Sequence, residues 1–352
     1  MKLLWFYTTS TSDSFSMVGD SRRHILRDIT SGIVVRYAFE APFLMQSLFG
    51  LASLQMQSLG VEHDRRRSLM YRAKSFEGYR KAIEEGDPNQ FPALLANSLL
   101  LCALSSQQFR EPDTKPLYIV DWILVWRGIG LMFDIMDESV LESSGLAGLF
   151  YRPPPDLEHA ELDVPNQLLF MVASIQPGDW DYEHVLAYYE TLKHLASLYS
   201  NLRKGWDASM QLRILTWPTF LPKAYIELLR TKRPRALVII SYFAMFLKLT
   251  HNIWWLRDIG QRSLTDLRRH LSPEFRAFMV APLAAQAMTD RTEICRMILD
   301  DPSWVISSSP YPAMITLEHP FVGRPGNADD TFLCHQDQPN ELVLLDGNPT
   351  KL

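Results

Sequence analysis

Few side chains in this 352-residue chain are grouped in a way that suggests acid–base or metal chemistry. His63 and Asp64 lie in "VEHDRRR", and Cys334, His335 and Asp337 lie in "LCHQDQ". Imidazole, thiolate and carboxylate groups are common metal ligands, and several of them carry protons in catalysis. Simpler interpretations exist, because Asp64 suits the positive start of a helix and the second group suits an exposed tail. We favour them, since short matches of this kind often arise by chance.

Longer catalytic and metal-binding motifs are absent from the sequence. It has no GxSxG elbow, no glycine-rich phosphate loop, no HExxH and no Cys/His pairing at metal spacing. Cys102, Cys295 and Cys334 are far apart and odd in number, which favours a reducing compartment over a disulfide framework or zinc module. We therefore expect no catalytic residue, no metal ligand and no cofactor.

Two basic runs could contact phosphate or serve as nuclear import signals, namely "DRRR" at 64–67 and "RTKRPR" at 230–235. The chain as a whole has a net charge of −5, so it lacks the basic surface that nucleic-acid binding normally requires. We favour an exposed helix face for the first run and a solvated turn between helices for the second.

Aromatic side chains gather in the second half of the sequence, where they suggest a ligand pocket. Large aromatic residues interleaved with flexible apolar ones supply the kind of surface that binds small lipophilic molecules. For any single residue, core packing is the favoured interpretation, because apolar side chains at helical spacing are first a burial signal. The group proposed to line a pocket consists of Trp217, Phe220, Tyr242, Phe243, Phe246, Trp254 and Trp255.

Helical periodicity dominates from Ala41 onward. One helix should end at Gly60 and the next at Gly86, and these two should form a hairpin. The second of them carries Leu69, Ala73, Phe76 and Ile83 on one face. Further helices are expected over 92–104 and 116–133, from Asp179 as N-cap to Gly205, from Pro222, from Pro234, and over 273–288. The fold class is all-α.

The remaining segments complete the predicted organisation. Residues 1–40 are expected to be a linker-like entry to a helical region over 41–290, whose halves are joined by a loop over 142–166. Residues 291–352 are expected to form a poorly structured tail, because most of them are rich in Pro, Gly and Asp. The apolar start ends at Thr8, which is too short for a signal peptide. The apolar run Ala236 to Leu247 is too short to span a membrane.

Several stretches, in order, resemble the regulatory region of fungal zinc-cluster transcription factors, and most closely the group similar to the sterol uptake control protein. The resemblance covers roughly residues 3–285. The stretches that carry it are "LLWFYTTSTSDSFS", "APFLMQSLFGLASLQMQSLG", "YRAKSFEGYRKAIEE", "LLANSLLLCALSSQQF", "WILVWRGIGLMFD" and "PTFLPKAYIELLRTKRPRALVIISYFAMFLKLTHNIWWLRDIGQRSLTDLRRHL".

The resemblance implies an all-helical domain that is often dimeric and nuclear. In the sterol regulators this domain holds a hydrophobic pocket for ergosterol and controls nuclear entry and activation. It also implies that "LLWFYTT" follows the linker after a DNA-binding module, so the chain is expected to start in the middle of a regulator. Two features depart from the family. The chain has three cysteines, whereas a fungal zinc cluster uses six, so no direct DNA contact by the family mechanism is expected. Ala281-Pro282 stands where relatives commonly have Trp-Pro.

Three functions remain open from the sequence. The first is a ligand-sensing regulatory domain that responds to a sterol or another lipophilic metabolite. The second is an interaction protein that forms a homodimer, or a heterodimer that titrates a full-length regulator. The third is an enzyme whose pocket acts on a hydrophobic metabolite, with acid–base groups drawn from Asp179, Asp181, His184 and His251.

Overall fold

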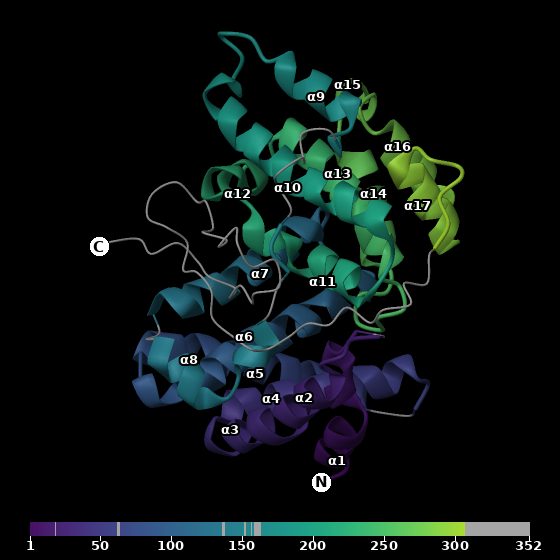
Figure 1. Cartoon of the computed structure of the whole chain (residues 1–352). Helices are drawn as coiled ribbons and strands as arrows, with labels where there is room; N and C mark the ends of the chain where they lie inside the picture. The colour runs from purple at the N-terminus through teal and green to yellow at the C-terminus, as the bar shows by residue number, and fades with distance from the viewer. Residues whose placement is uncertain are drawn as a thin grey trace. The chain divides into compact units, whose positions relative to one another are not determined.

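The computed structural model describes residues 1–17, 19–61, 64–135, 138–150, 153–155, 157 and 163–306. These residues form helices and turns and contain no strand, which confirms the all-α prediction (Figure 1). The chain divides into two compact units. The described residues of unit 1 come from 1–107 and 125–153, and those of unit 2 come from 108–124 and 154–306.

The N-terminal segment of unit 1 is helical. It contains α1 (Lys2–Thr9), η1 (Thr11–Phe15), α2 (Arg23–Asp28), the π-helical turn η2 (Ile29–Ile33) and α3 (Val34–Glu40). Tyr7, Leu26 and Val34 are buried, so this segment belongs to the core. A buried ion pair, in which Arg22 Nη2 lies 2.8 Å from Asp20 Oδ2, orders the turn before α2. Helical structure thus begins before Ala41, and residues 1–40 are not an extended linker.

A helical hairpin follows, as the sequence predicted, formed by α4 (Pro42–Ser58) and α5 (Arg65–Glu85). Gly60 adopts a left-handed φ of 71°, and the Val61 N–H donates to the Met56 carbonyl at 2.9 Å, as in a Schellman C-cap. The Asp64 carboxylate accepts from the N–H groups of Arg66 and Arg67, which makes it the N-cap of α5.

Small side chains join the two helices of the hairpin. Ser68, Ser75 and Ala82 are the buried residues of α5, and Gly78 packs so closely on Phe43 that a Cβ there would lie 2.8 Å from the Phe43 Cβ. Tyr71 and Tyr79 of α5 also meet Phe49 and Phe43 of α4 edge-on, with ring centroids 5.4 and 6.1 Å apart. Leu69, Phe76 and Ile83, the large residues of the predicted face, are not among the buried residues of α5. Their position is described below.

The rest of unit 1 surrounds α6 (Phe91–Ser106), which carries Pro92 in its first turn, as predicted. The other elements are η3 (Pro88–Gln90), α8 (Glu138–Ser144), η5 (Ala147–Phe150) and the second part of α7 (Tyr118–Ile135), from Val125 onward. The segment 142–166 was predicted to be a loop, but its first residues end α8 and form η5.

Unit 2 surrounds α13 (Pro234–Leu249), whose residues from Ala236 to Leu247 are all buried. Proline starts both this helix and α12, as predicted. The other elements are η4 (Gln107–Arg110), α9 (Asn166–Ala173), η7 (Tyr182–His184), α10 (Val185–Lys204), α11 (Ala208–Thr216), η8 (Trp217–Phe220), α12 (Lys223–Arg230), α14 (Ile259–His270), α15 (Pro273–Arg276), α16 (Val280–Ala287) and α17 (Arg291–Leu299).

Three predicted boundaries in unit 2 differ from the structure. Asp179 caps the turn that leads into η7, where its Oδ1 accepts from the Asp181 N–H at 2.9 Å, and α10 starts only at Val185. The helix expected over 273–288 is broken into α15 and α16, with the side chain of Met279 buried at the break. Residues 291–299 form α17, with Ile294 buried, although they were assigned to the tail.

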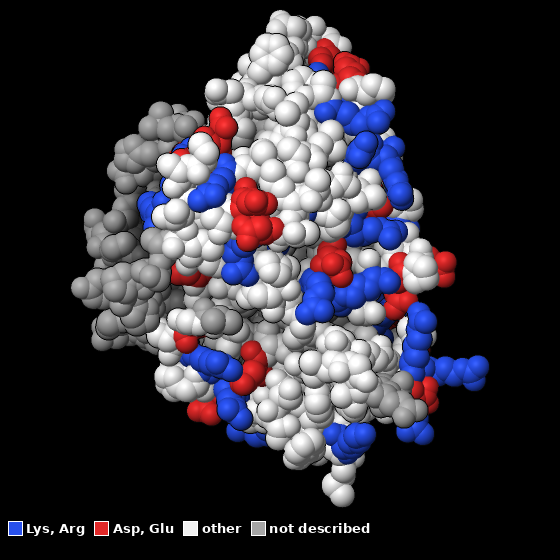
Figure 2. Space-filling model, turned by 90° about the vertical axis from the view of Figure 1, so that its right-hand side faces the viewer, with Lys and Arg blue, Asp and Glu red and all other residues white. Residues whose placement is uncertain are grey.

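Charged side chains of both signs are interspersed with uncharged ones on the face shown in Figure 2, and no broad field of one sign covers it. Within the described ranges, no helix has the length and hydropathy needed to cross a bilayer. Nor do those ranges bring together three or more His, Cys, Asp or Glu side chains in a group that could hold a metal ion.

Candidate functional site

The aromatic residues proposed as a pocket all belong to unit 2, where they lie on η8, on α13 and in the turn that follows α13. Trp217 stacks on Phe243 with ring centroids 4.3 Å apart, and Phe246 meets Tyr199 edge-on at 5.0 Å. Trp254 is only partly buried, and Arg110 donates to its carbonyl at 2.6 Å. The buried members of the group are Trp217, Phe220, Tyr242, Phe243, Phe246 and Trp255.

The polar atoms of this aromatic cluster differ in how well they are satisfied. The Tyr242 hydroxyl lies 2.9 Å from both Gln167 Oε1 and the Phe278 carbonyl, and burial raises its pKa well above the ordinary value. The Trp217 indole N–H has no acceptor among the described residues, although this side chain is 2% exposed. A buried donor without a partner is unusual and costs stability, so Trp217 Nε1 is the one atom of the cluster that is suited to a polar ligand group.

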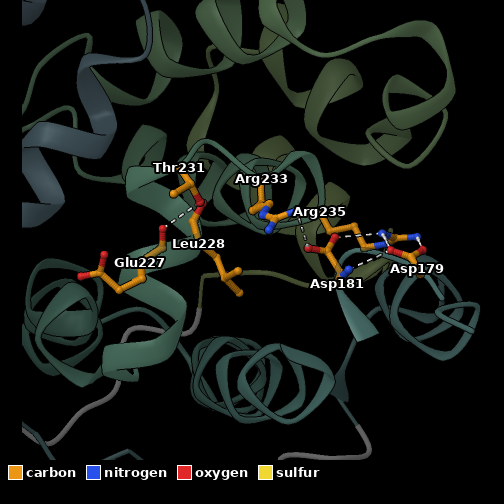
Figure 3. Close-up of polar contacts among 7 residues, drawn as sticks. All are labelled: Asp179, Asp181, Glu227, Leu228, Thr231, Arg233 and Arg235. Carbon is orange, nitrogen blue, oxygen red and sulfur yellow. Dashed lines mark hydrogen bonds and ion pairs between the residues drawn. The ribbon is translucent and has the colours of Figure 1, made fainter. Parts of the chain in front are cut away.

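The basic run at 230–235 covers the last residue of α12, the turn at 231–233 and the start of α13. Figure 3 shows the carboxylates of Asp179 and Asp181 beside Arg233 and Arg235. Arg235 reaches Asp179 Oδ2 at 2.7 Å and Asp181 Oδ2 at 2.8 Å. Arg233 Nη1 lies 3.8 Å from Asp181 Oδ1. Arg230 Nη1 lies 3.1 Å from a carboxylate oxygen of Glu227. Residues 231–233 form the predicted turn, but Arg235 is held in ion pairs with its side chain 12% exposed rather than solvated, so much of the positive charge of the run is already neutralised.

The same contacts set the protonation of Asp179. Burial raises the pKa of this carboxyl, but the Asp181 N–H and the Arg235 guanidinium favour its ionised form more strongly. The pKa of Asp179 therefore lies below its ordinary value, and the carboxylate is an ion-pair partner rather than a proton carrier at neutral pH.

The residues of the enzyme hypothesis do not form one site. Asp181 contacts Arg235 near the start of α13, whereas His251 follows the end of that helix. Helix α13 has 16 residues and is therefore about 24 Å long, so Arg235 and His251 lie at its opposite ends. His251 is exposed, with Nδ1 3.2 Å from the Lys248 carbonyl, and His184 lies at the start of α10. Of the two short clusters, Asp64 is a helix cap, while His63, Cys334, His335 and Asp337 lie outside the described residues.

A second region, which the sequence did not identify as a site, is an apolar groove on unit 1. It has a volume of about 650 Å³ and lies along one flank of α5, beside α6 and α7. That volume lies within the range of small-ligand and peptide-binding clefts. The sequence signal for it is the sevenfold repeat of Ser68, Ser75 and Ala82, which are the buried residues of α5, while the large apolar residues one position further along stay exposed. The residues that line the groove are Phe76, Glu77, Tyr79, Arg80, Ile83, Ser98, Leu101, Val125 and Gly128.

Comparison with known proteins relates the chain to one class. It is 32% identical over 301 residues to a Zn(2)-C6 fungal-type transcription factor of Gibberella zeae. The match covers 76% of this chain and 57% of that protein, so the chain spans little more than half the length of the curated relative. No protein-family model matches the sequence. The chain is thus a homologue of a fungal Zn(2)-C6 transcription factor, as the motifs in its sequence indicated.

Proposed function

We propose that this chain acts in the nucleus as the regulatory region of a transcription regulator. The observation that carries the proposal is the match to a Zn(2)-C6 transcription factor, which covers 76% of the chain. The all-helical fold is compatible with it, although a fold alone does not assign a function.

A tethering experiment tests this role. The chain is fused to a heterologous DNA-binding domain that lacks activity of its own, and a reporter is measured in fungal cells with normal and depleted sterol. We expect the fusion to change reporter output relative to the DNA-binding domain alone. Equal output from the fusion and the DNA-binding domain under both conditions would contradict the proposal.

The finer part of the proposal is that the aromatic cluster of unit 2 binds a sterol or another lipophile with one polar group. Its support is the unpartnered Trp217 N–H, since a ligand hydroxyl would supply the missing acceptor within a large apolar surface. Entry would require the side chains around the Trp217–Phe243 stack to move apart.

Two matched variants test the ligand site. Trp217→Phe removes the indole N–H but keeps an aromatic ring, and Trp254→Phe makes the same change at the partly buried tryptophan. We expect saturable binding of dehydroergosterol to delipidated protein, weakened about tenfold by the first change and little by the second, as for loss of one buried hydrogen bond. Lack of saturable binding to the wild type would contradict lipophile sensing.

The interaction role remains a second candidate, supported by the resemblance to a family whose regulatory domains often dimerise. It predicts a homodimer, or a heterodimer with a full-length regulator that is thereby titrated. Size-exclusion chromatography with light scattering tests the first form, and co-purification with such a regulator tests the second. A strict monomer that captures no regulator would exclude both forms.

A further inference from the structure

Helix α5 presents a stripe of large apolar side chains that are more than a third exposed. Leu69, Phe76 and Ile83 recur every seven residues, so they lie along one line of the helix. They are 44%, 38% and 37% exposed, whereas the buried Ser68, Ser75 and Ala82 occupy the neighbouring line. Phe76 and Ile83 also line the groove beside α6 and α7. This stripe is thus the edge of a hollow in which further apolar side chains can be buried.

Positive charge borders the stripe. Arg65, Arg72 and Arg80 each stand four residues from Leu69 or Phe76, so they lie one turn away on the same side of the helix. Arg80 lines the groove with its side chain 77% exposed, and it shares its charge with Glu84 at 3.7 Å. Glu77 is the acidic side chain that lines the groove. Over its whole length α5 carries seven Lys and Arg against three Glu, within a chain of net charge −5.

We propose that this surface docks an acidic amphipathic helix of a partner protein. A helix laid in the groove would place apolar residues at spacings of three and four on Phe76, Ile83 and Leu101, and acidic residues beside the bordering arginines. Exposed apolar side chains rimmed by arginine are typical of such interfaces. The proposal goes beyond the regulatory function above, because it assigns a partner surface to unit 1.

The other occupants fit this surface less well. Nucleic acid would satisfy the arginines but would leave the apolar groove unfilled. A lipid surface takes up apolar residues that project from a protein, whereas Phe76 and Ile83 line a hollow. A second copy of the chain would oppose two helices of like net charge.

The test uses the full chain and fluorescein-labelled peptides. One probe is a 21-residue amphipathic helix with leucines at spacings of three and four and glutamates elsewhere, and its partner probe has lysine in place of glutamate. We expect saturable binding of the acidic peptide that weakens with added salt, and at least tenfold weaker binding of the basic peptide.

Variants on α5 supply matched controls. We expect Phe76→Ala with Ile83→Ala to weaken binding of the acidic peptide about tenfold or more, as for loss of apolar anchors. Arg80→Glu should weaken it severalfold and reduce its salt dependence. Met70→Ala and Lys74→Glu change an exposed apolar and an exposed basic residue on another side of the same helix, and they should change binding less than about twofold. Circular dichroism verifies that every variant is folded.

Several results would overturn the proposal. One is the absence of saturable binding by the acidic peptide, and another is an equal loss in the Met70→Ala and Phe76→Ala with Ile83→Ala variants. Tighter binding to phosphatidylserine vesicles or to duplex DNA, lost in the Phe76 and Ile83 variant, would assign the surface to a membrane or to nucleic acid. A dimer, seen by light scattering, that this variant dissociates would assign it to a second copy of the chain.

Discussion

At the residue scale, the carboxylate of Asp179 links the stability of unit 2 to pH. Its folded-state pKa lies below the ordinary value, although burial opposes this, because the Asp181 N–H and Arg235 favour the ionised form. Such a group contributes stability above its unfolded pKa of about 3.9, and the contribution is lost as pH falls through the folded value. Urea denaturation at pH 5 and at pH 2.5 should show a smaller acid-induced loss for Asp179→Asn than for the wild type.

A variant of Arg235, the ion-pair partner of Asp179, tests whether this ion pair causes the pH effect. Arg235→Gln removes the cation that binds Asp179 and Asp181, so it should also flatten the acid-induced loss. The double variant should flatten it little further, because the two changes break one interaction. Additive effects on the pH dependence would mean that Asp179 and Arg235 act on the acid-induced loss separately and not through their ion pair.

Lys248 is a second residue whose effect on stability can be predicted. Its ammonium group lies 2.7 Å from the carbonyls of Ala285 and Met288, 3.0 Å from that of Gln286, and 2.8 Å from Gln261 Oε1. It therefore caps the end of α16, where backbone carbonyls lack helical partners and a positive charge is favourable.

Replacing this lysine by methionine keeps the length of the side chain and removes the hydrogen bonds. We expect Lys248→Met to lower the free energy of unfolding by about 2–3 kcal/mol, as for loss of charged hydrogen bonds. The exposed Lys223 offers a matched control, and its change to methionine should stay within about 0.5 kcal/mol. Equal effects in the two variants, measured by urea denaturation, would show that the cap of α16 does not matter.

At the scale of elements, the space around three glycines shows how closely the helices pack at each position. An alanine Cβ at Gly260 would lie 2.6 Å from the Ala244 carbonyl oxygen, and one at Gly78 would lie 2.8 Å from the Phe43 Cβ. At Gly128 it would meet no atom within 4 Å. An added methyl group would therefore meet backbone at Gly260, a side chain at Gly78 and open space at Gly128.

The three alanine variants should change the free energy of unfolding by different amounts, and one of them should raise it. Gly260→Ala should lower the free energy of unfolding by more than about 3 kcal/mol, because the backbone of α13 must move. Gly78→Ala should cost about 1–3 kcal/mol, and Gly128→Ala should gain up to about 1 kcal/mol from helix propensity. Thermal and urea unfolding followed by circular dichroism measure the order, and a loss in Gly128→Ala as large as in Gly78→Ala would be inconsistent with it.

The elements that the sequence predicted correctly are those with local stop and start signals. Gly60 and Gly86 end α4 and α5, and Pro92, Pro222 and Pro234 lie at helix starts, because these residues restrict the backbone wherever they stand. Most of the elements that it missed are short, and the exception is α14, which has 12 residues. The helices before residue 41 and α17 have fewer than ten residues each, too few to display the helical period, and tertiary packing stabilises them.

The candidate sites show a similar division. The aromatic cluster could be predicted as a group, because its members recur on α13 and its neighbours. Whether they form a core or a pocket does not follow from spacing, since both need the same apolar side chains. The groove on unit 1 was missed for another reason. It depends on which side of α5 faces α4, and that side carries small residues together with Tyr71 and Tyr79, which apolar periodicity does not single out.

At the scale of the whole molecule, the two units do not correspond to two halves of the sequence. Residues 108–124 belong to unit 2, although residues 125–153 return to unit 1 before the rest of unit 2 begins. That early segment contains Ile119, Trp122 and Ile123, all fully buried, and Trp122 packs edge-on against Phe109. The predicted division at the loop 142–166 therefore assigns residues 108–124 to the first half, although they belong to unit 2.

A pair of fragments tests this interleaving. Residues 154–306 alone lack the buried segment. The loss of each large buried side chain should cost several kcal/mol, so that their sum approaches or exceeds the stability of a typical domain. We expect this fragment to melt without a cooperative transition, whereas 108–306 should melt cooperatively in circular dichroism. Cooperative melting of both fragments at similar temperatures would instead mean that α10 to α17 form a complete core, with residues 108–124 only lying on its surface.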